Sequence, residues 1–427
     1  MIVLATLGIL LLLLLASIPV AVAILALGLV LGYFFSGYPL HRLLGEVFWS
    51  ASTDFLLLSI PLFVLLGEIL LRAGIARRTY GALDKWLSWL PGGLMHANIG
   101  TAAMFAATSG SSVATAATIG TVGLPQARRY GYHEGLFAGT IAAGGTLGIL
   151  IPPSINLIVY GFLTNTSIPQ LFLAGIVPGI LLALVFMAVI LVICLIRPGL
   201  SGGVRRASWG ERLRSLQDLL PVLFIFAIVI GSIYTGWATP TESAALGVIA
   251  AVLLALRYRA VGLRFLQEVA EGTVRTTAMI MLILIAANYL NFVLDSVGLA
   301  ELLKRFVQNL GLSPLKTLLA IIALYVVLGF FVETLSLMVI SVPIVFPVIV
   351  GAGFHPVWFG ILLILLIEMA LITPPVGLNL YVVQGVRGRG TIGEVIVGST
   401  PFVLGIFIMI GILVLWPELA LFLARNV

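Results

Sequence analysis

The chain has 427 residues, of which 61% are hydrophobic and only 9% are Asp, Glu, Lys or Arg, and its mean hydropathy is +1.22. Because a soluble domain carries about 25% charged residues, this composition excludes soluble, disordered, fibrous and nucleic-acid-binding proteins and indicates a polytopic membrane protein. An excess of Lys and Arg on one face of the membrane explains the net charge of +6. The single cysteine, Cys194, lies in an apolar run, which excludes a disulfide framework and a cysteine metal site.

Apolar runs that approach the roughly 20 residues of a membrane span predict ten crossings. They are 2–16, 19–36, 55–72, 136–163, 170–196, 218–236, 240–257, 276–294, 357–383 and 394–422. The first two share one apolar run interrupted at Pro19, and a single long tilted helix is the alternative. Residues 1–6 contain no Lys or Arg, so a cleaved signal peptide is not expected.

Two further apolar stretches, 97–122 and 315–350, are predicted to be re-entrant hairpins. The first is rich in Ala, Ser, Thr and Gly, and the second is interrupted by Glu333-Thr334-Leu335-Ser336. Each stretch is long for one helix, each half is short for a crossing, and small polar residues mark the middle.

The basic residues predict the orientation. This layout places every Lys and Arg on one side of the membrane except Arg42, Lys304, Arg305, Lys316 and Arg425. By the positive-inside rule, the richer side faces the cytoplasm and both termini lie on the other side. For a bacterial inner membrane, we expect periplasmic termini.

Two halves of the chain, 1–214 and 215–427, echo one another. Ile151-Pro152-Pro153 recurs as Thr373-Pro374-Pro375, and Pro125 with His133 recurs as Pro347 with His355, each 222 residues later. Each half is predicted to hold five crossings and one hairpin, and the odd number inverts the second half relative to the first. Inverted repeats with interrupted helices are the architecture of secondary transporters, whose binding site lies at the repeat interface. A structural membrane subunit that preserves a duplication is the alternative.

Oxygen-rich segments at the first hairpin tip and in the broken crossing after it predict a cation site. Opened turns expose carbonyls, and carbonyl and hydroxyl oxygens suit a hard cation such as sodium. Half-helix N-termini at the midplane also attract a carboxylate. The predicted sodium ligands are Gly110, Ser111, Ser112, Gly144, Gly145, Gly148 and Pro152. Close packing of small residues, or a proline kink relieved by water, is the alternative.

The second hairpin predicts a second sodium site in the same manner, so that two or more sodium ions act as coupling ions. Its ligands are Glu333, Thr334, Ala370, Thr373 and Pro374. Substrate specificity is expected in a few side chains between the hairpin tips, namely Ser109, Ser111, Asn156, Thr334, Ser336 and Asn379. No catalytic residue and no metal other than sodium is expected.

The remaining ionisable residues carry weaker signals. Glu68 and Glu368 lie inside crossings, and we favour pairing with a neighbouring helix or a position at an interface. Glu242 lies near the end of a crossing, where water can solvate its charge, so the charge costs little free energy. His133 and His355 have no carboxylate or cysteine at ligand spacing, so a metal site is not expected there.

Several long motifs make the chain resemble the large membrane (permease, DctM-like) subunit of tripartite ATP-independent periplasmic (TRAP) transporters. The resemblance covers essentially the whole chain and rests on the runs 109–120, 148–155, 333–336 and 373–380, together with Pro343 and Pro347. Many relatives carry Asp where this chain has Glu333.

The resemblance implies sodium-driven import of an organic anion, such as a C4-dicarboxylate or a sialic acid, by an elevator-type fold and motion. It implies substrate delivery by a soluble periplasmic binding protein and bracing by a small four-helix membrane subunit, here a separate polypeptide. By this analogy the hairpins and broken crossings move, while the scaffold lies within 1–72 and 218–294, mostly 19–72 and 240–294. Partner docking is expected at Arg42, Glu46, Asp54, Glu301, Lys304 and Arg305.

Composition alone leaves rivals. Two hairpins entering from opposite faces disfavour a channel, isolated carboxylates disfavour an intramembrane enzyme, and the lack of a Gly-Lys-Ser or Gly-Lys-Thr phosphate loop disfavours an ATP-driven pump. A sodium/dicarboxylate cotransporter that needs no binding protein is the leading alternative, and a non-transporting structural subunit is the second.

Overall fold

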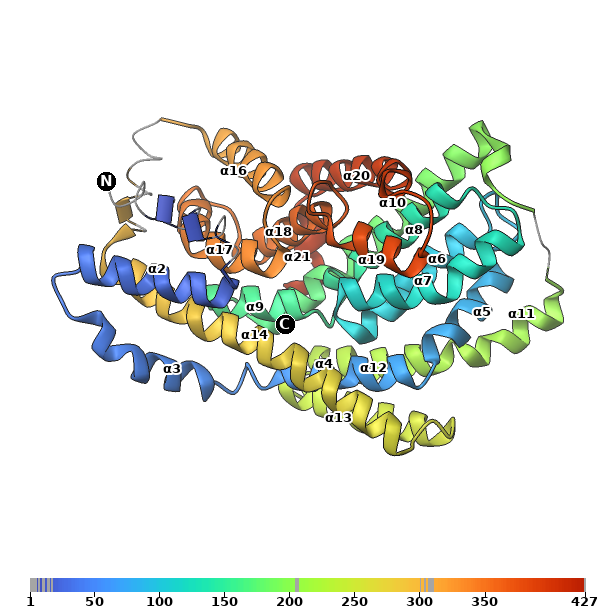
Figure 1. Cartoon of the computed structure of the whole chain (residues 1–427), viewed down its shortest axis with the longest axis horizontal. Coiled ribbons are helices and arrows are strands. Elements are labelled where there is room, and N and C mark those ends of the chain that lie inside the picture. The colour runs from blue at the N-terminus through green and yellow to red at the C-terminus, as the bar shows by residue number, and fades with distance from the viewer. Residues whose placement is uncertain are drawn as a thin grey trace.

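The computed structural model describes residues 6–425 except 7, 10, 11, 14, 15, 17, 204–206, 300, 303, 304 and 306–310. The described part consists of helices joined by short non-helical segments and contains no β-strand (Figure 1). This confirms the predicted all-helical membrane fold. The predicted crossing at 2–16 and the charge of Lys304 lie mostly or wholly outside the described residues.

The first half of the chain is a run of helices interrupted at short turns. It comprises α2 (Val20–Phe35), η1 (Leu40–Leu43), α3 (Leu44–Ser52), α4 (Ser59–Arg72), α5 (Ile75–Leu87), α6 (Leu94–Ser109), α7 (Ser112–Arg129), α8 (Glu134–Thr146), η2 (Leu147–Ile149), α9 (Ile155–Thr164) and α10 (Ile168–Ile196). Pro19 is the N-cap residue of α2, so a helix begins where the proline predicts one.

The second half follows a similar order after a polar connection. It comprises η3 (Pro198–Leu200), α11 (Trp209–Ser215), η4 (Leu216–Asp218), α12 (Leu220–Tyr234), α13 (Pro240–Arg257), α14 (Leu263–Ser296), α16 (Pro314–Gly329), α17 (Thr334–Gly351), α18 (Pro356–Leu371), α19 (Leu378–Arg387), α20 (Ile392–Leu415) and α21 (Glu418–Ala424).

The number of long helices differs from the ten predicted crossings. Five described helices, α10, α13, α14, α17 and α20, are long and apolar enough to span a membrane, and the bent pairs α4–α5 and α11–α12 raise this number to seven. The crossings at 136–163 and 357–383 are absent from that set because each is cut into short helices, α8 with α9 and α18 with α19, and the crossing at 19–36 is absent because α2 has 16 residues. The interruptions that mark the crossings at 136–163 and 357–383 therefore shorten their helices. Helix α17 is in the set although the stretch 315–350 was predicted to be a re-entrant hairpin.

Three predicted loops contain helices, which corrects the sequence-based layout. Helix α3 lies in the loop 36–54, α5 follows α4 after a 65° bend, and α11 lies in the loop after α10. Helix α5 buries Ile75, Thr79 and Tyr80, while Arg77 and Arg78 are exposed. Hydropathy averaging overlooks such amphipathic helices, because charged residues on one face offset apolar residues on the other.

Helices α6 and α7 form the first hairpin, and α16 and α17 form the second. Their second helices begin at Ser112 and Thr334, after the N-cap residues Ser111 and Glu333, which are 222 positions apart. His133 and His355, also 222 apart, cap α8 and α18: their Nδ1 atoms accept hydrogen bonds from the backbone N–H groups of Leu136 and Val357. The capping explains both histidines without a metal.

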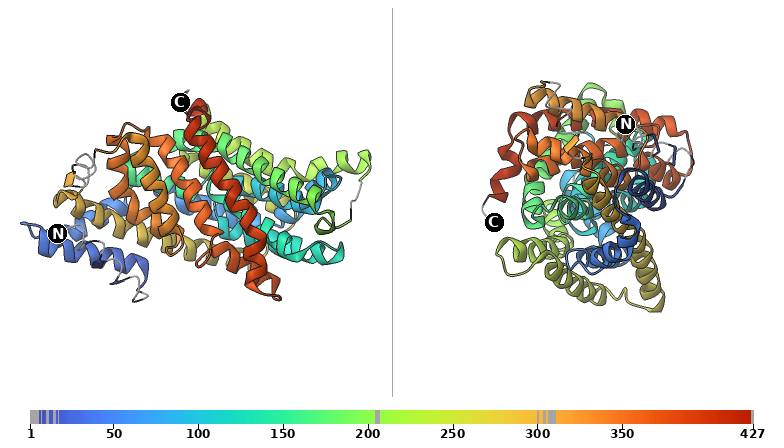
Figure 2. Two further views of the ribbon diagram at one scale, coloured as in Figure 1. Left: turned by 90° about the horizontal axis from the view of Figure 1, so that it is seen from above. Right: turned by 90° about the vertical axis from the view of Figure 1, so that its left-hand side faces the viewer.

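Helices α2, α3, α4, α13 and α14 pack against one another and, with α12, form one layer of the molecule (Figure 1). The hairpins and broken helices lie beside this layer. Each short half-helix contacts the hairpin of the other half, α9 against α17 and α19 against α7. Figure 2 shows α20 and α21 running along the surface in the view from above.

Candidate functional site

The first hairpin tip is a tight turn of small residues. Gly110 has a positive φ of 58°, which allows the chain to leave α6 and enter α7 without the steric cost that a side chain imposes. Ser109 Oγ lies 2.9 Å from Thr115 Oγ1, and Thr115 Oγ1 donates to the Ser111 carbonyl at 2.7 Å. These bonds hold the tip as a compact cluster of oxygen atoms inside the protein.

The first broken helix meets this tip directly. A Cβ atom placed on Gly148 would lie 2.7 Å from the Ser111 carbonyl oxygen, and one on Gly110 would lie 3.1 Å from the Pro153 carbonyl oxygen. Gly145 approaches Ala116 in α7 to a similar degree, and Gly144 approaches Ala102 in α6. The glycines around the break therefore allow backbone-to-backbone contact, which places the predicted first-site residues side by side.

Asn379 joins the two halves at this point. Its Nδ2 atom donates to Ser112 Oγ at 2.8 Å and to the Ala142 carbonyl at 3.0 Å. The side chain is fully buried, and its Oδ1 atom has no hydrogen-bond partner among the described residues. Asn379 was predicted to contact substrate, and the structure places it beside the first cluster of predicted sodium ligands.

The second hairpin tip meets the second break in a comparable way. A Cβ atom on Gly329 would lie 2.8 Å from Ala370 Cβ, and the Val376 N–H donates to the Phe330 carbonyl at 3.3 Å. Thr373 Oγ1 donates to the Met369 carbonyl at 2.9 Å, so this hydroxyl is engaged with its own helix. Ala370 and Val376 therefore contact the second tip, and Thr373 and Pro374 lie between them in the chain.

Glu333 has a structural task that sequence reasoning did not predict. One carboxylate oxygen accepts from Thr334 Oγ1 and the Leu335 N–H, and the other accepts from the Ser336 N–H and Oγ, at 2.8 to 3.1 Å. The carboxylate thus caps α17, where negative charge is favourable. The hydroxyl groups of Thr334 and Ser336 donate to the carboxylate as part of this cap.

Asn156, the counterpart of Asn379, is buried in α9, and its Nδ2 atom has no partner among the described residues.

The layer formed by α4 and α14 reaches the first tip. A Cβ atom on Gly67 would lie 3.1 Å from the Ser109 backbone, and a small cavity of about 50 Å³ between these elements is lined in part by Glu68, Ser109, Ser111 and Thr276. Glu68 accepts from Arg72 at 3.0 Å, and Arg72 also donates to Glu268 in α14 at 2.8 Å. Arg72 lies in the same helix as Glu68, so the pairing with a neighbouring helix is not what the structure shows, and the Glu–Arg spacing of four residues is the sequence signal of the pair within α4. Glu68 does lie at an interface, the other predicted position, because a Cβ atom on Gly272 of α14 would lie 2.5 Å from its carboxyl carbon.

Glu368 behaves differently, because this side chain is fully buried in α18 and neither carboxylate oxygen has a partner among the described residues. Pairing with a neighbouring helix is not found within that part of the chain, whereas the alternative prediction of a position at an interface agrees with the packing of α18 against α16, α17 and α20. A buried carboxyl group without a partner is tolerated in its neutral form rather than as an ion.

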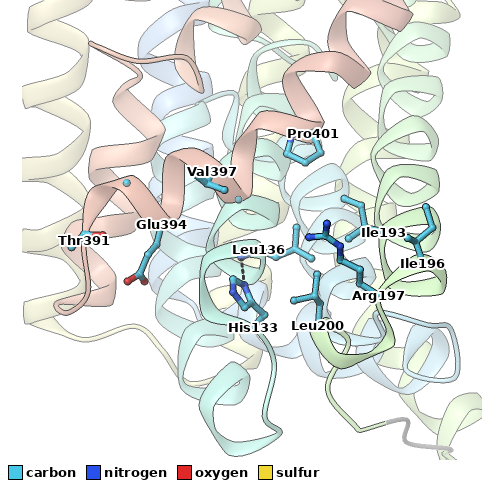
Figure 3. A pocket seen from close by; sticks show the side chains of 12 residues that line it. His133, Leu136, Ile193, Ile196, Arg197, Leu200, Thr391, Glu394, Val397 and Pro401 are labelled. Atoms are coloured by element: carbon cyan, nitrogen blue, oxygen red, sulfur yellow. Dashed lines mark hydrogen bonds between the residues drawn. The ribbon is translucent and has the colours of Figure 1, made fainter.

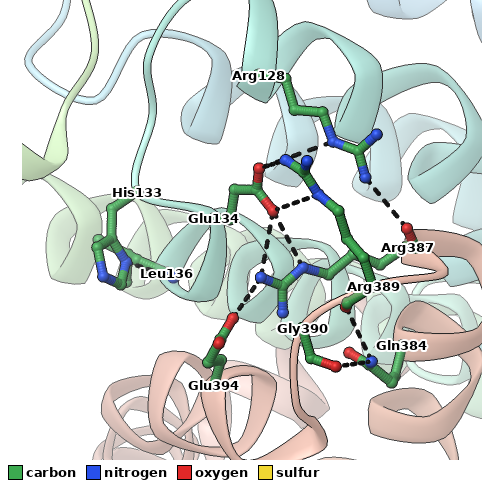
Figure 4. A network of polar contacts seen from close by, with 9 residues as sticks. All are labelled: Arg128, His133, Glu134, Leu136, Gln384, Arg387, Arg389, Gly390 and Glu394. Atoms are coloured by element: carbon green, nitrogen blue, oxygen red, sulfur yellow. Dashed lines mark hydrogen bonds and ion pairs between the residues drawn. The ribbon is translucent and has the colours of Figure 1, made fainter.

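A network of charged side chains lies where α7 and α19 end and α8 and α20 begin, and it was not predicted from the sequence (Figure 4). Arg387, whose side chain is 4% exposed, donates to Glu134 at 3.2 Å and also binds Glu394. Arg389 pairs with Glu134 as well, and Arg128 donates to the Arg387 carbonyl at 3.2 Å. The network joins α7 and α8 to α19 and α20. No local signal reveals it, because Glu134 and Arg387 are 253 residues apart.

The described part of the chain has helices long enough to span a membrane and two helical hairpins, each of which meets a broken helix. These features define the class of secondary-transporter folds. The model of the family described as tripartite ATP-independent periplasmic transporter, DctM component, matches residues 7–419. The chain belongs to this family of TRAP-transporter large permeases.

Curated relatives align with this chain over most of their length. The C4-dicarboxylate TRAP transporter large permease protein DctM of Pseudomonas aeruginosa is 35% identical and the alignment covers 89% of this chain and 88% of that protein. The protein of the same description from Rhodobacter capsulatus is 32% identical over 97% of both chains. The sialic acid TRAP transporter large permease protein SiaM of Vibrio cholerae is 33% identical, covering 87% and 86%. These relatives are transporter permease subunits.

A solved structure has a similar fold. The Alcanivorax borkumensis YdaH transporter, described as having an unusual topology, superposes with a TM-score of 0.61 over 93% of this chain and 97% of that chain. At 16% sequence identity this likeness concerns the fold alone.

Proposed function

We propose that this chain is the transporting subunit of a sodium-coupled importer of a small organic anion that works by an elevator motion. The observation that carries the proposal is the meeting of each hairpin tip with a broken helix, shown by the Gly148–Ser111 and Gly329–Ala370 contacts. The family relationship and the relatives named for C4-dicarboxylates and sialic acid support an organic acid as the substrate class.

A buried, unpartnered oxygen atom supports the first of the two proposed sodium sites. Near the first hairpin tip, the Asn379 Oδ1 atom is buried without a partner among the described residues, so this region offers one uncommitted oxygen for a hard cation. Gly110 to Ser112 would hold one ion with Gly144, Gly145, Gly148 and Pro152. Glu333 and Thr334 would hold another with Ala370, Thr373 and Pro374. A bound sodium ion supplies positive charge that favours the substrate carboxylate.

The proposed movement separates two packed groups of helices. The layer containing α2, α4, α13 and α14 acts as the scaffold, and the hairpins with the broken helices slide along it. The close contact of Gly67 in α4 with the Ser109 backbone supports this movement. Gly67 has no side chain that would obstruct the tip as it slides along α4. The substrate then binds between the hairpin tips, near Ser109, Ser111, Asn156, Thr334, Ser336 and Asn379.

The proposal includes two protein partners. The family description names a tripartite system, which supports a separate small membrane subunit and a soluble periplasmic binding protein. Arg42, Glu46, Asp54, Glu301 and Arg305 remain the proposed docking charges on the periplasmic side, with inner-membrane location and periplasmic termini.

Reconstitution tests this function. Proteoliposomes containing this chain, the small subunit and the binding protein should accumulate a carboxylate substrate when an inward sodium gradient is applied. Omission of either partner should lower uptake at least tenfold, and replacement of sodium by potassium should abolish it. Robust sodium-driven uptake by this chain alone would favour the binding-protein-independent cotransporter, whereas no uptake of any carboxylate by the complete system would favour a structural subunit.

A further inference from the structure

A pocket remote from the hairpin tips opens between the end of α10 and the start of α20 (Figure 3). Its volume is about 820 Å³. The walls are apolar and include Leu136, Ile193, Ile196, Val397 and Pro401, and we refer to it as the α10–α20 pocket. Such walls suit a hydrocarbon chain rather than a small organic anion, which needs polar partners throughout.

One rim of the pocket carries hydrogen-bond donors. Arg197, the C-cap residue of α10, is exposed and its guanidinium has no partner among the described residues. Figure 3 shows this side chain reaching from α10 toward Leu136. His133 accepts the Leu136 N–H at Nδ1, so the neutral ring carries its hydrogen on Nε2 and can donate that hydrogen to a ligand.

The acidic residue at the pocket does not cancel these donors. Glu394 lines the same rim, but its carboxylate is bound by Arg387, which also pairs with Glu134. Arg197 therefore remains an uncommitted positive charge at the mouth of the pocket. Its charge is complementary to an anionic headgroup.

The helix ends place the pocket at the membrane boundary. Helices α10 and α20 are both long enough to span a bilayer, and the pocket lies where α10 ends at Ile196 and α20 begins at Ile392. Ile196 and Val397 are 72% and 73% exposed, so the pocket wall continues into surface that faces lipid chains. An apolar cavity open to the bilayer, with an arginine at its polar end, matches the two parts of a phospholipid.

We propose that the α10–α20 pocket binds one anionic phospholipid, with an acyl chain against Ile193 and Val397 and the phosphate on Arg197 and His133. The lipid comes from the leaflet in which α10 ends, the cytoplasmic leaflet in the predicted orientation. The pocket lies between the end of α10 and the starts of α8 and α20, so a bound lipid contacts both halves of the chain.

Lipid retention measured by native mass spectrometry tests the proposal. The full-length chain is delipidated in detergent and incubated with phosphatidylglycerol or phosphatidylcholine of identical acyl chains. We expect one phosphatidylglycerol per chain to survive gas-phase activation, with phosphatidylcholine retained at least fivefold less. Arg197→Gln should lower the retained phosphatidylglycerol about tenfold, and the control Arg214→Gln, at another exposed arginine, should leave it unchanged.

A second pair of variants tests the walls. Val397→Trp fills the pocket and should remove the retained lipid, whereas Leu404→Trp, at an exposed position of α20 outside the pocket, should not. Equal retention of both lipids, or equal effects of the two arginine variants, would overturn the proposal. Loss of lipid on adding the small membrane subunit would also overturn it, since that subunit would then be the occupant.

Discussion

At the residue scale, the contact between Gly148 and Ser111 sets how closely the first hairpin approaches the broken helix. A methyl group at position 148 would lie 2.7 Å from a carbonyl oxygen and 2.8 Å from its carbon, both of them backbone atoms that have little freedom to move. Glycine is therefore required there by space rather than by helix propensity, since Ala is the better helix former.

We predict that Gly148→Ala destabilises the protein by about 1–3 kcal/mol, the usual cost of overpacking, and lowers sodium-driven uptake at least tenfold. Gly231→Ala in α12, where a Cβ meets nothing within 4 Å, is the matched control and should be neutral or slightly stabilising. Thermal unfolding in detergent and uptake in proteoliposomes measure the two effects. Wild-type behaviour of Gly148→Ala would contradict the tight contact.

Asn379 and Ser112 provide the second prediction at this scale. Asn379→Leu removes donors to Ser112 Oγ and the Ala142 carbonyl and should cost about 1–3 kcal/mol. Ser112→Ala removes one of those bonds and should cost less. Because the side chains touch, the double variant should be less destabilised than the sum of the single variants, by about 0.5–3 kcal/mol in a double-mutant cycle. Strict additivity would argue against the bond.

At the element scale, helices α8 and α20 cross at glycines rather than through side chains. A Cβ atom on Gly139 would overlap the Gly398 carbonyl group, and one on Gly398 would overlap the Gly135 carbonyl. Small residues that allow close backbone approach are a common means of joining helices in membranes. The contact links the first half of the chain with the second, close to the network of Glu134 and Arg387.

We predict that Gly139→Ala lowers the midpoint of thermal unfolding by several degrees. The added methyl group would overlap the Gly398 carbonyl, so α8 and α20 must move apart to make room for it. Gly411→Ala, in the same helix α20 but with open space at the Cβ position, should have little effect. If the two variants unfold at the same temperature, the crossing is not close.

At the scale of the whole molecule, the chain is two similar runs of helices whose matching parts lie about 222 residues apart. The hairpin N-caps Ser111 and Glu333 and the capping histidines His133 and His355 all keep this spacing. Each half supplies a hairpin that packs against a short helix of the other half, so neither half completes its contacts alone.

Labelling of single cysteines tests the inverted arrangement. In a chain carrying Cys194→Ala, Arg129→Cys and Asn165→Cys place thiols at exposed positions on either side of the broken helix formed by α8 and α9. A membrane-impermeant maleimide should label position 165 from the periplasm and position 129 only after the cytoplasmic face is opened. Labelling of both from one side would contradict the orientation predicted from the basic residues.

The sequence by itself determined the class of protein, the positions of both hairpin tips and both breaks, and the family resemblance. These features are local: hydropathy marks apolar helices, and Gly, Pro and Ser mark the points where helices stop. Thus Gly110, Pro152 and Glu333 are correctly placed at turns. The sodium ions assigned to these positions stay a prediction.

Only the tertiary structure decided which side chains of the two halves meet. Asn379 binds Ser112 from 267 residues away, Glu134 binds Arg387 from 253, and Glu333 uses its carboxylate as a helix cap. The amphipathic helix α5 in a predicted loop also became visible only through the residues that it buries. The physical reason is that periodicity and composition report how a segment meets its solvent, whereas a hydrogen bond between distant helices depends on how the helices pack together.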